Sequence, residues 1–312
     1  MKEILLARHG LLKAVREFFY TGGYVEVETP NLMRTAPPDP FIEPLKVFAG
    51  GKGPFQLHTS PEMGMKKLLP FCERIFQVCK TYRVEELDEV HNTEFTMLEW
   101  YMPGTYEDAI GELEHLVSYL IDQLKVEGSQ YLKGPWVSRT LEEIFVERTG
   151  VSPLGMDRAT LQEVLREKGL RISGREGWED LFFMFYVQEV EPWLHDVDTL
   201  VVRDWPVWLS SMAKKKDDSR VERFEFYVRG LELANGYTEL LDPEEQRERF
   251  VTDNKKRMFQ GKQVFALDLE LLDALPAING PVAGVSVGLD RLLMALLQVE
   301  RIEEVLPFRI KI

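Results

Sequence analysis

Three separate stretches of the sequence concentrate residue types that bind charged ligands. The first holds Arg83 and a run of charged side chains between two apolar segments. The second sets Glu232 and Glu239 seven residues apart around an Asn-Gly pair, and the third places Arg291 shortly after the small-residue run 284–288. Guanidinium groups bind carboxylates and phosphates, and carboxylates bind hard cations. These residues can act together only if the fold brings the three stretches to one place.

The first stretch is typical of a β-hairpin. An apolar run at residues 74–80 precedes a charged loop, and residues 95–101 follow the loop with alternating side chains. In an extended strand, Phe95, Met97 and Glu99 would point to one face. A loop this rich in charge is usually a solvated turn, so this stretch alone does not indicate a site. The loop contains Glu85, Glu86, Asp88, Glu89, His91, Asn92 and Glu94.

The other two stretches also predict strands. Residues 223–230 alternate and residues 231–240 continue them, which favours two neighbouring strands. Residues 284–288 form a small-residue strand that leads into an apolar helix carrying Arg291. The other segments of the sequence have the patterns of further helices and strands. We expect helices at 9–20, 106–124 and 243–260, strands at 24–29, 55–59 and 199–206, and about three further helices within 140–192.

Ser60, Pro61 and Glu62 form a predicted helix start after the strand at 55–59. Ser suits the cap, Pro the first helical position and Glu the first turn. Capping explains these three residues without any function. Residues 213–219 read as a charged loop, for which solvation is again the ordinary explanation.

Composition indicates a globular, cytoplasmic protein. The chain has 312 residues and 45% hydrophobic residues, enough for a substantial core. No apolar run approaches the roughly 20 residues that cross a membrane, and the N-terminus lacks a signal-peptide core. Cys72 and Cys79 do not make a disulfide framework and are expected to be reduced. The net charge of −14 argues against a large nucleic-acid-binding face.

The three stretches, together with the helix, strand and proline of residues 9–30, resemble the motif set of class II aminoacyl-tRNA synthetases in the order in which that family carries it. The lysyl-tRNA synthetase branch is the most similar, and within it the short paralogues that attach lysine to elongation factor P. The resemblance covers nearly the whole chain. It implies an α+β fold with a mostly antiparallel β-sheet flanked by helices, and a homodimer built on the first motif.

The same resemblance predicts the domain organisation. We expect one catalytic domain over residues 1–312, with a helical insertion at about 140–195 between the second and third motifs, lying as a flap over the sheet. Lysyl-tRNA synthetases carry an N-terminal anticodon-binding barrel. Because this sequence starts shortly before the first-motif helix, we expect that barrel to be absent and transfer to tRNA to be disfavoured.

The resemblance implies that ATP and Mg²⁺ serve to activate a carboxylic acid as its adenylate. Neither a Walker A motif nor a GxGxxG run before a helix is present. By resemblance, Arg83 contacts the carboxylate and the α-phosphate, while Arg291 covers adenine or holds the γ-phosphate; both are the expected catalytic residues. Glu232 would ligate Mg²⁺, with Glu239 as a candidate second ligand. The implied ATP-binding set is Arg83, Val84, Glu85, His91, Asn92, Phe95, Glu232, Leu233, Gly288 and Arg291.

Roles within the loop follow from the same resemblance. Glu85 would read the adenine amino group, Phe95 would stack on adenine, and His91 and Asn92 would meet the phosphates. In the amino-acid pocket, the family residues that hold a side-chain ammonium match Glu239 and Tyr101, and Glu62 would accept from a substrate ammonium. The implied substrate-binding set is Ser60, Pro61, Glu62, Glu99, Tyr101, Asn235, Glu239 and Ser286.

Two positions depart from the pattern of the lysyl branch. Val84 stands where the family commonly has asparagine, so one hydrogen-bonding side chain near ATP is missing. Ser286 stands where lysyl-tRNA synthetases usually have glycine, whereas the paralogues acting on elongation factor P tend to have a small non-glycine residue. A side chain there narrows the pocket near the substrate backbone, which favours (R)-β-lysine over α-lysine.

The leading hypothesis is therefore an ATP-dependent ligase that adenylates (R)-β-lysine or lysine. It would then pass the acyl group to the ε-amine of a lysine on elongation factor P, with no dedicated base for that amine evident in the sequence. One alternative is a minimal enzyme that charges tRNA or a small amine. A second is a regulatory paralogue without catalysis, against which the presence of Arg83, Glu232 and Arg291 argues.

Overall fold

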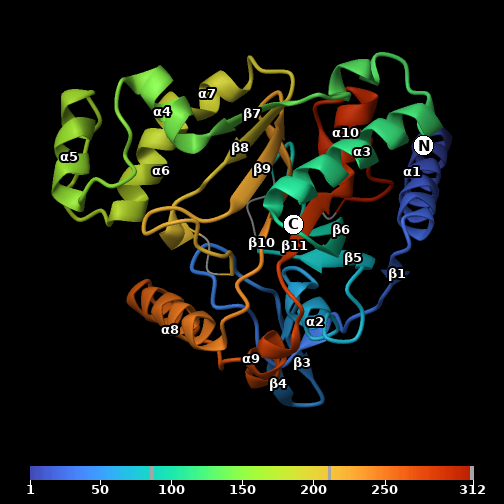
Figure 1. The fold of residues 1–312 in the computed structure, drawn as a ribbon, viewed down its shortest axis with the longest axis horizontal. Coiled ribbons are helices and arrows are strands. Elements are labelled where there is room, and N and C mark those ends of the chain that lie inside the picture. Colours follow the sequence, from blue (N-terminus) through green and yellow to red (C-terminus); the bar gives the residue numbers. More distant parts are fainter. Residues whose placement is uncertain (85–87, 210–211, 310–312) are drawn as a thin grey trace.

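An eight-stranded β-sheet lies at the centre of the molecule (Figure 1). The computed structural model of the chain describes residues 1–84, 88–209 and 212–309. Across the sheet, the strands follow the order β1 (Val25–Glu26), β5 (Ile75–Tyr82), β6 (Glu94–Pro103), β11 (Val282–Gly288), β10 (Leu231–Thr238), β9 (Arg223–Val228), β8 (Leu200–Arg203) and β7 (Val137–Thr140). Neighbours are antiparallel except for the parallel pairs β1–β5 and β7–β8 at the two edges. This confirms the predicted α+β fold with a mostly antiparallel sheet.

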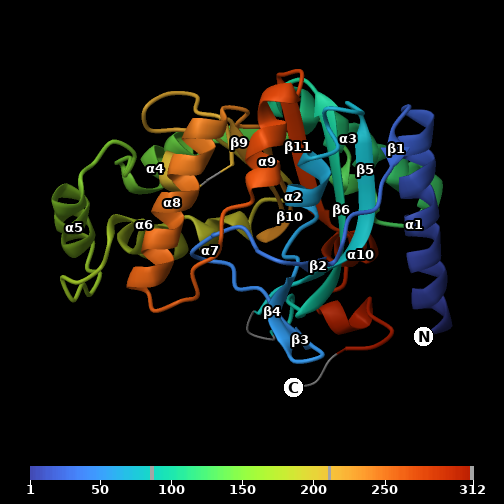
Figure 2. The same ribbon diagram turned by 90° about the horizontal axis from the view of Figure 1, so that it is seen from below.

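Three helices bury one face of this sheet: α1 (Lys2–Thr21), α3 (Tyr106–Leu124) and α10 (Leu289–Leu297). Figure 2 shows them gathered on one side of β5, β6 and β11. Leu98 and Trp100 of β6 point into the core between them. Phe19 of α1 stacks on Phe76 of β5, with ring centroids 4.8 Å apart. Helix α3 begins with a capping box between Thr105 and Asp108, which satisfies its first backbone donors.

The opposite face is covered by three helices and a small sheet. They are α2 (Glu62–Lys66), α8 (Pro243–Phe259), α9 (Leu269–Ala274) and the three-stranded sheet of β2 (Leu32–Met33), β4 (Lys52–Leu57) and β3 (Lys46–Ala49). Short 3-10 helices complete the chain at Ser129–Leu132, Val207–Leu209, Leu275–Ala277 and Ile302–Glu304. Met63 and Met65 of α2, Phe250 of α8 and Leu271 of α9 form a second apolar core on this face. No helix in the described part of the chain is long and apolar enough to cross a membrane.

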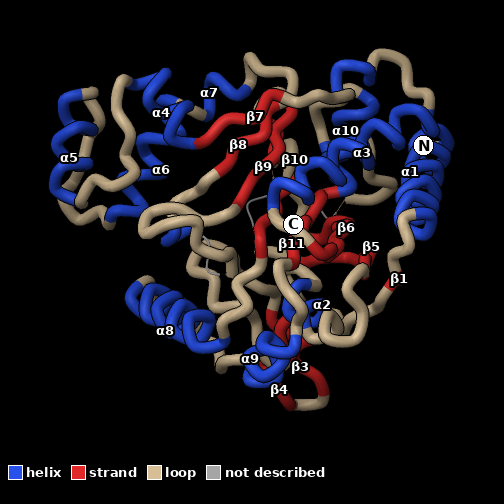
Figure 3. Tube along the Cα trace, in the orientation of Figure 1, coloured by secondary structure: helices blue, strands red, loops and turns tan. Residues whose placement is uncertain are grey.

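The segment between the second and third motifs forms a helical unit beside the sheet (Figure 3). It comprises α4 (Leu141–Thr149), α5 (Arg158–Glu167), α6 (Trp178–Glu189) and α7 (Glu191–Leu194). Its own apolar core includes Phe145, Phe182 and Phe185, and this core extends onto Leu200 and Val202 of β8. The helical nature of this segment was predicted correctly, but it packs against the β8 end of the sheet.

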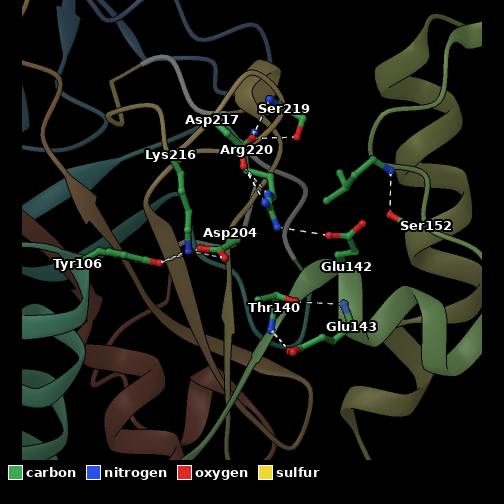
Figure 4. A network of polar contacts seen from close by, with 11 residues as sticks. Tyr106, Thr140, Glu142, Glu143, Ser152, Asp204, Lys216, Asp217, Ser219 and Arg220 are labelled. Carbon is green, nitrogen blue, oxygen red and sulfur yellow. Dashed lines mark hydrogen bonds and ion pairs between the residues drawn. The ribbon is translucent and has the colours of Figure 1, made fainter.

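A polar network ties this helical unit to the central sheet (Figure 4). The Asp204 carboxylate accepts hydrogen bonds from the Tyr106 hydroxyl and the Lys216 ammonium, each at 2.8 Å. Asp204 is buried and adopts φ 63°, a conformation that is uncommon outside glycine. Asp204 and Arg220 both lie in the loop that joins β8 to β9. An Arg220 guanidinium nitrogen lies 3.3 Å from a carboxylate oxygen of Glu142 in α4. The loop therefore connects α3 of the sheet core with α4 of the helical unit.

That loop departs from the prediction of a purely solvated segment. Lys216 forms an ion pair with buried Asp204, and Ala213 forms a β-bridge with Glu239. The loop thus closes one side of the region around Glu239. Its lysines themselves make these bonds, as the Lys214 amide does to the Thr238 carbonyl, so composition alone suggested a free loop.

Three other predictions of local structure need correction. Helix α1 begins at Lys2, seven residues before the predicted start. The predicted strand 24–29 is only β1, a two-residue edge pairing with β5. At α2 the cap is Pro61 and not Ser60; the Ser60 hydroxyl instead accepts from the Glu62 amide at 3.4 Å.

Candidate active site

Cross-strand pairing brings residues of all three sequence stretches into one row. Reading across β5, β6, β11, β10 and β9, this row contains Gln77, Glu99, Ser286, Asn235 and Glu225. A second row, two residues away along the strands, contains Tyr101, Gly284 and Tyr237. Since side chains alternate along a strand, both rows face the same side of the sheet.

A cavity of about 200 Å³ lies beside the middle of the first row, at Ser286 and Asn235. It is lined by Arg83, Val90, His91, Asn92, Phe95, Met97, Glu232, Leu233, Ala234, Asn235, Ser286, Gly288, Asp290, Arg291 and Ile302. An adjoining cavity of about 820 Å³ shares Val90, His91, Glu232 and Arg291 with it. We call these the inner and outer cavities. The three stretches that the sequence singled out therefore meet at one hollow.

Arg83 and Phe95 face each other across the hairpin of β5 and β6. The Arg83 guanidinium lies 5.2 Å from the centre of the Phe95 ring, and its Nε donates to the Thr59 carbonyl at 3.1 Å. These contacts hold the guanidinium at the cavity wall beside an aromatic face. A planar base can stack on such a ring while the guanidinium binds an anion.

Arg291 is held by a chain of hydrogen bonds at the opposite wall. One terminal nitrogen donates to the Glu232 carbonyl at 3.0 Å, and the other lies 2.6 Å from His91 Nε2. Arginine can only donate, so His91 Nε2 accepts and its Nδ1 donates to Asp88, 2.7 Å away. The chain fixes both the arginine and the imidazole before any ligand binds.

Glu232 reaches the cavity because β10 is irregular at this point. The pairing register between β10 and β9 shifts between Glu232 and Ala234, so Leu233 is an extra residue on its strand. Such a bulge changes the direction of the side chains next to it. Glu232 lines both cavities, and Leu233 lies in the core with part of its surface at the inner cavity.

A compact group of charged residues lies near the inner cavity. Glu62, Glu99 and Glu239 are each less than a tenth exposed, and Lys66 is 1% exposed. Lys66 Nζ lies 2.6 Å from Glu62 and 2.5 Å from Glu239. The Tyr237 hydroxyl donates to Glu62. We call Glu62, Lys66, Glu99 and Glu239 the buried charge cluster.

Glu99 has a hydrogen-bond donor on each oxygen. The Tyr101 hydroxyl donates to one at 2.7 Å and the Ser286 hydroxyl donates to the other at 2.8 Å. Burial, followed by the negative charge of Glu62, raises the pKa of Glu99 to about 8. Burial likewise raises the pKa of Glu239 to about 8, although Lys66 opposes the shift. The cluster thus has a strong affinity for positive charge.

Only glycine fits at position 284, between the side chains of Glu239 and Tyr101. A Cβ atom at this position would lie 2.4 Å from a Glu239 oxygen and 2.6 Å from the Tyr101 ring. Both contacts are closer than real Cβ atoms allow. Glycine therefore lets Glu239 and Tyr101 approach the strand from the same face.

Comparison with known proteins gives this arrangement a family. The model of the family described as tRNA synthetases class II (D, K and N) matches residues 1–311. The chain belongs to this class II synthetase family. The elongation factor P--(R)-beta-lysine ligase of Pectobacterium atrosepticum is 37% identical, with 98% of this chain and 95% of the relative covered. The ligases of the same name from Mannheimia succiniciproducens and Salmonella typhi are 37% and 34% identical, covering 97% and 98% of this chain and 94% of each relative.

Most of the site residues expected from the class II resemblance gather at the two cavities or in the buried charge cluster. At the inner cavity these are Arg83, His91, Asn92, Phe95, Glu232, Leu233, Asn235, Ser286, Gly288 and Arg291. Ser60 and Pro61 immediately precede Glu62 of the cluster, and Tyr101 bonds to Glu99 within it. Their catalytic and binding roles stay predictions.

One described residue of the expected ATP-binding set, Val84, does not line the inner cavity. Val84 is 53% exposed, and its amide donates to the Glu43 carbonyl. Glu85 lies outside the described residues. Glu239 and Glu232 were paired as candidate metal ligands, but the structure places the Glu239 carboxylate against Lys66. Within the described ranges, no group of three or more His, Cys, Asp or Glu residues could hold a metal ion.

Sequence reasoning missed three residues of this class II site. Lys66 was missed, although its spacing of four residues from Glu62 puts both on one helix face. Tyr237 lies between the two singled-out residues Asn235 and Glu239, and strand alternation could have found it. Asp290 accepts from the Thr96 amide at 2.7 Å and pairs with Arg8, which anchors the turn that carries Arg291. No local signal in the sequence distinguishes that aspartate.

Proposed function

We propose that this chain is an ATP-dependent ligase that adenylates (R)-β-lysine or lysine and transfers the acyl group to the ε-amine of a lysine on elongation factor P. The observation that carries the proposal is the buried charge cluster at the end of the cavity that holds Arg83 and Arg291. Relatives about as long as this chain, at 34–37% identity, carry the name of that activity. A cavity of arginines next to buried carboxylates suits ATP and a diamino acid.

The first step joins two anions. A carboxylate oxygen of the amino acid attacks the α-phosphorus of ATP, the bond to the bridging oxygen breaks, and pyrophosphate leaves. Arg83 would bridge the attacking carboxylate and the α-phosphate, and Phe95 would stack on adenine. Arg291, held by His91 and the Glu232 carbonyl, would neutralise charge on the phosphates. Catalysis would rest on positioning and charge, because no covalent nucleophile is needed.

The second step forms an amide. The unprotonated ε-amine of the acceptor lysine attacks the acyl carbonyl, AMP leaves, and the amine loses a proton. The outer cavity adjoins the inner one at His91, Glu232 and Arg291, and we propose that the acceptor side chain enters through it.

The residues present fit a divalent cation only together with ATP. Glu232 offers a carboxylate oxygen at the wall shared by both cavities. Glu239 is engaged by Lys66, so we assign Glu232 to Mg²⁺ and Glu239 to a substrate ammonium. When bound, Mg²⁺ would neutralise phosphate charge.

Ser286 lies where it would affect the choice between (R)-β-lysine and α-lysine as substrate. Its hydroxyl donates to Glu99 and it also lines the inner cavity, so its side chain occupies space beside the substrate backbone. We propose that this favours (R)-β-lysine, whose amino group is shifted by one carbon. We further propose that the enzyme acts in the cytoplasm as a homodimer and does not use tRNA.

The transfer step is tested by incubating the enzyme with ATP, each lysine isomer and elongation factor P, followed by mass spectrometry of the factor. The expected result is a gain of one lysyl residue on a single lysine, larger with (R)-β-lysine. Parallel reactions with tRNA, resolved on acid gels, are expected to show no charging. Charged tRNA with an unmodified factor would contradict the proposed acceptor.

A further inference from the structure

Lys66 is a buried cation for which the proposed reaction has no use. It is 1% exposed, and its ammonium lies between Glu62 on its own helix α2 and Glu239 at the end of β10. It also lies 5.5 Å from the centre of the Tyr237 ring. Burial would lower the pKa of Lys66, but the carboxylates of Glu239 and Glu62 raise it above its ordinary value. These carboxylates therefore favour the charged form of Lys66.

The buried charge cluster has more carboxyl groups than cations. It holds three carboxylates, those of Glu62, Glu99 and Glu239, against the single ammonium of Lys66. Glu99 already has hydroxyl donors on both oxygens. Glu239 Oε1 has no hydrogen-bond partner among the described residues. A buried carboxylate oxygen without a donor is costly. Burial raises the pKa of Glu99 and of Glu239 to about 8, so at neutral pH each holds a proton that a bound ammonium group would displace.

We propose that Lys66 is a built-in cation of the amino-acid pocket, and that it sets the pocket's charge to match a substrate with two ammonium groups. The inference rests on the proposed function. With Lys66 in place, two carboxylate charges remain for the two ammonium groups of a diamino acid, while Arg83 takes the carboxylate. Without Lys66, a diamino acid would leave one carboxylate unpaired. Lys66 acts through Glu62 and Glu239, so it is a positioning residue that determines specificity.

Substitutions at Glu239 and Lys66, made singly and together, test whether Lys66 sets the charge of the pocket. Glu239→Gln removes one negative charge and leaves the pocket with a surplus cation when a diamino acid binds. Adding Lys66→Met to that variant removes the cation and restores two net negative charges. We expect Glu239→Gln to lower kcat/KM for lysine-dependent ATP–pyrophosphate exchange by at least about a hundredfold, and the double variant to regain at least about tenfold, mainly through KM. A double variant no better than Glu239→Gln would overturn the proposal.

Stability gives a second measurement that packing alone would not produce. Lys66→Met alone leaves three carboxylates without a cation, so it should melt at a lower temperature than the charge-balanced double variant. Lys66→Arg keeps the charge and is expected to recover most of the KM. A double variant that melts below Lys66→Met, or that does not fold, contradicts the proposal.

The matched control is Lys67→Met. Lys67 is the next residue on α2, but its ammonium pairs with Asp268 and Glu270 away from the cluster. The kcat/KM of the Lys67→Met variant should equal that of the wild type. If the wild type shows no exchange with either lysine isomer, the proposed function fails, and the proposal with it. If the wild type exchanges normally while Glu239→Gln and Lys66→Met have additive effects on kcat/KM, only the proposed role of Lys66 fails.

Discussion

At the scale of single residues, the site is preorganised by hydrogen bonds between its own charged groups. Arg291 donates to His91 and to the Glu232 carbonyl, and Glu99 accepts from Tyr101 and Ser286. Groups fixed in advance need no reorganisation when charge develops on the reacting phosphate. The residues expected to bind ligand are therefore already held by hydrogen bonds within the candidate site.

Arg291→Ala tests the nucleotide half of the site. Removing a preorganised charged donor typically costs about 10² to 10³ in kcat, so we expect ATP–pyrophosphate exchange to fall by at least about a hundredfold. Glu232→Ala should have a similar effect that added Mg²⁺ relieves in part. Circular dichroism should show an unchanged fold. The matched control is Arg175→Ala, an exposed arginine in the helical unit; exchange at the wild-type rate in Arg291→Ala would refute the assignment.

The pH dependence of substrate binding tests the amino-acid half. Burial and Glu62 raise the pKa of Glu99 to about 8, so an ammonium must displace a proton below that pH. We expect KM for lysine to fall as pH rises from about 6.5 to 8, while the lysine side chain, with its pKa of about 10.4, stays charged. In Glu99→Gln this slope should be smaller, and an unchanged slope would exclude Glu99 as the titrating group.

The same pKa shift has a consequence for stability with a definite sign. The native state binds a proton on Glu99 that the unfolded state releases above its ordinary pKa of 4.5. Native-state stability therefore declines as pH rises from about 4.5 to 8. Urea unfolding of the ligand-free enzyme across this range should show the decline, and Glu99→Gln should show less of it.

The family resemblance predicted where much of the candidate site would lie, because Arg83, Glu232 and Arg291 belong to the three stretches that match its motifs. Lys66 could not, since nothing in the sequence states that α2 faces the end of β10. That contact joins residues 173 positions apart in the chain, as the numbers of Lys66 and Glu239 show. Burial and pairing of a charge depend on tertiary structure.

At the scale of elements, the irregular points of the fold are the ones that position the site. The bulge at Leu233 turns Glu232 toward the cavity, and the loop around Asp204 connects α3 to the helical unit. Regular strands and long helices were predicted well because their apolar periodicity is strong. The bulge was not predicted and α2 was predicted only by its start at residues 60–62, because one extra residue or one turn leaves little periodic signal.

The Asp204 network should contribute measurably to stability. Asp204→Ala leaves the Tyr106 hydroxyl and the Lys216 ammonium without their acceptor. Lys216 can turn to solvent, so we expect a loss of about 1–3 kcal/mol in the free energy of unfolding, measured with urea. Asp218→Ala, an exposed neighbour in the same loop, is the control and should change stability by less than about 0.5 kcal/mol. Equal effects of the two substitutions would show that the network does not stabilise the fold.

At the scale of the whole molecule, the order of strands assembles the active site. β11, near the C-terminus, lies between β6 and β10, which places Ser286 between Glu99 and Asn235. The family resemblance predicted a mostly antiparallel sheet, but the residues alone could not supply this strand order. Long-range pairing depends on many side chains at once and leaves no local signature.

The exposed side of α1 tests the predicted homodimer. Leu5 and Leu6 are 48% and 59% exposed, and Val25 of the adjoining β1 is 50% exposed. We expect sedimentation at twice the chain mass of 36.2 kDa, and a shift to the monomer when Leu5 and Leu6 are both replaced by glutamate. A wild-type monomer at micromolar concentration would contradict the proposed assembly. Leu269→Glu, an exposed leucine at the start of α9, serves as the control.

The most direct measurement is ATP–pyrophosphate exchange with (R)-β-lysine, α-lysine and norleucine, which lacks the side-chain ammonium of lysine. The buried charge cluster predicts exchange with the two diamino acids, faster with (R)-β-lysine, and at least about a hundredfold less with norleucine, because a carboxylate would remain buried and unpaired. Equal exchange with norleucine, or no exchange with either lysine isomer, would contradict a site built to activate a diamino acid.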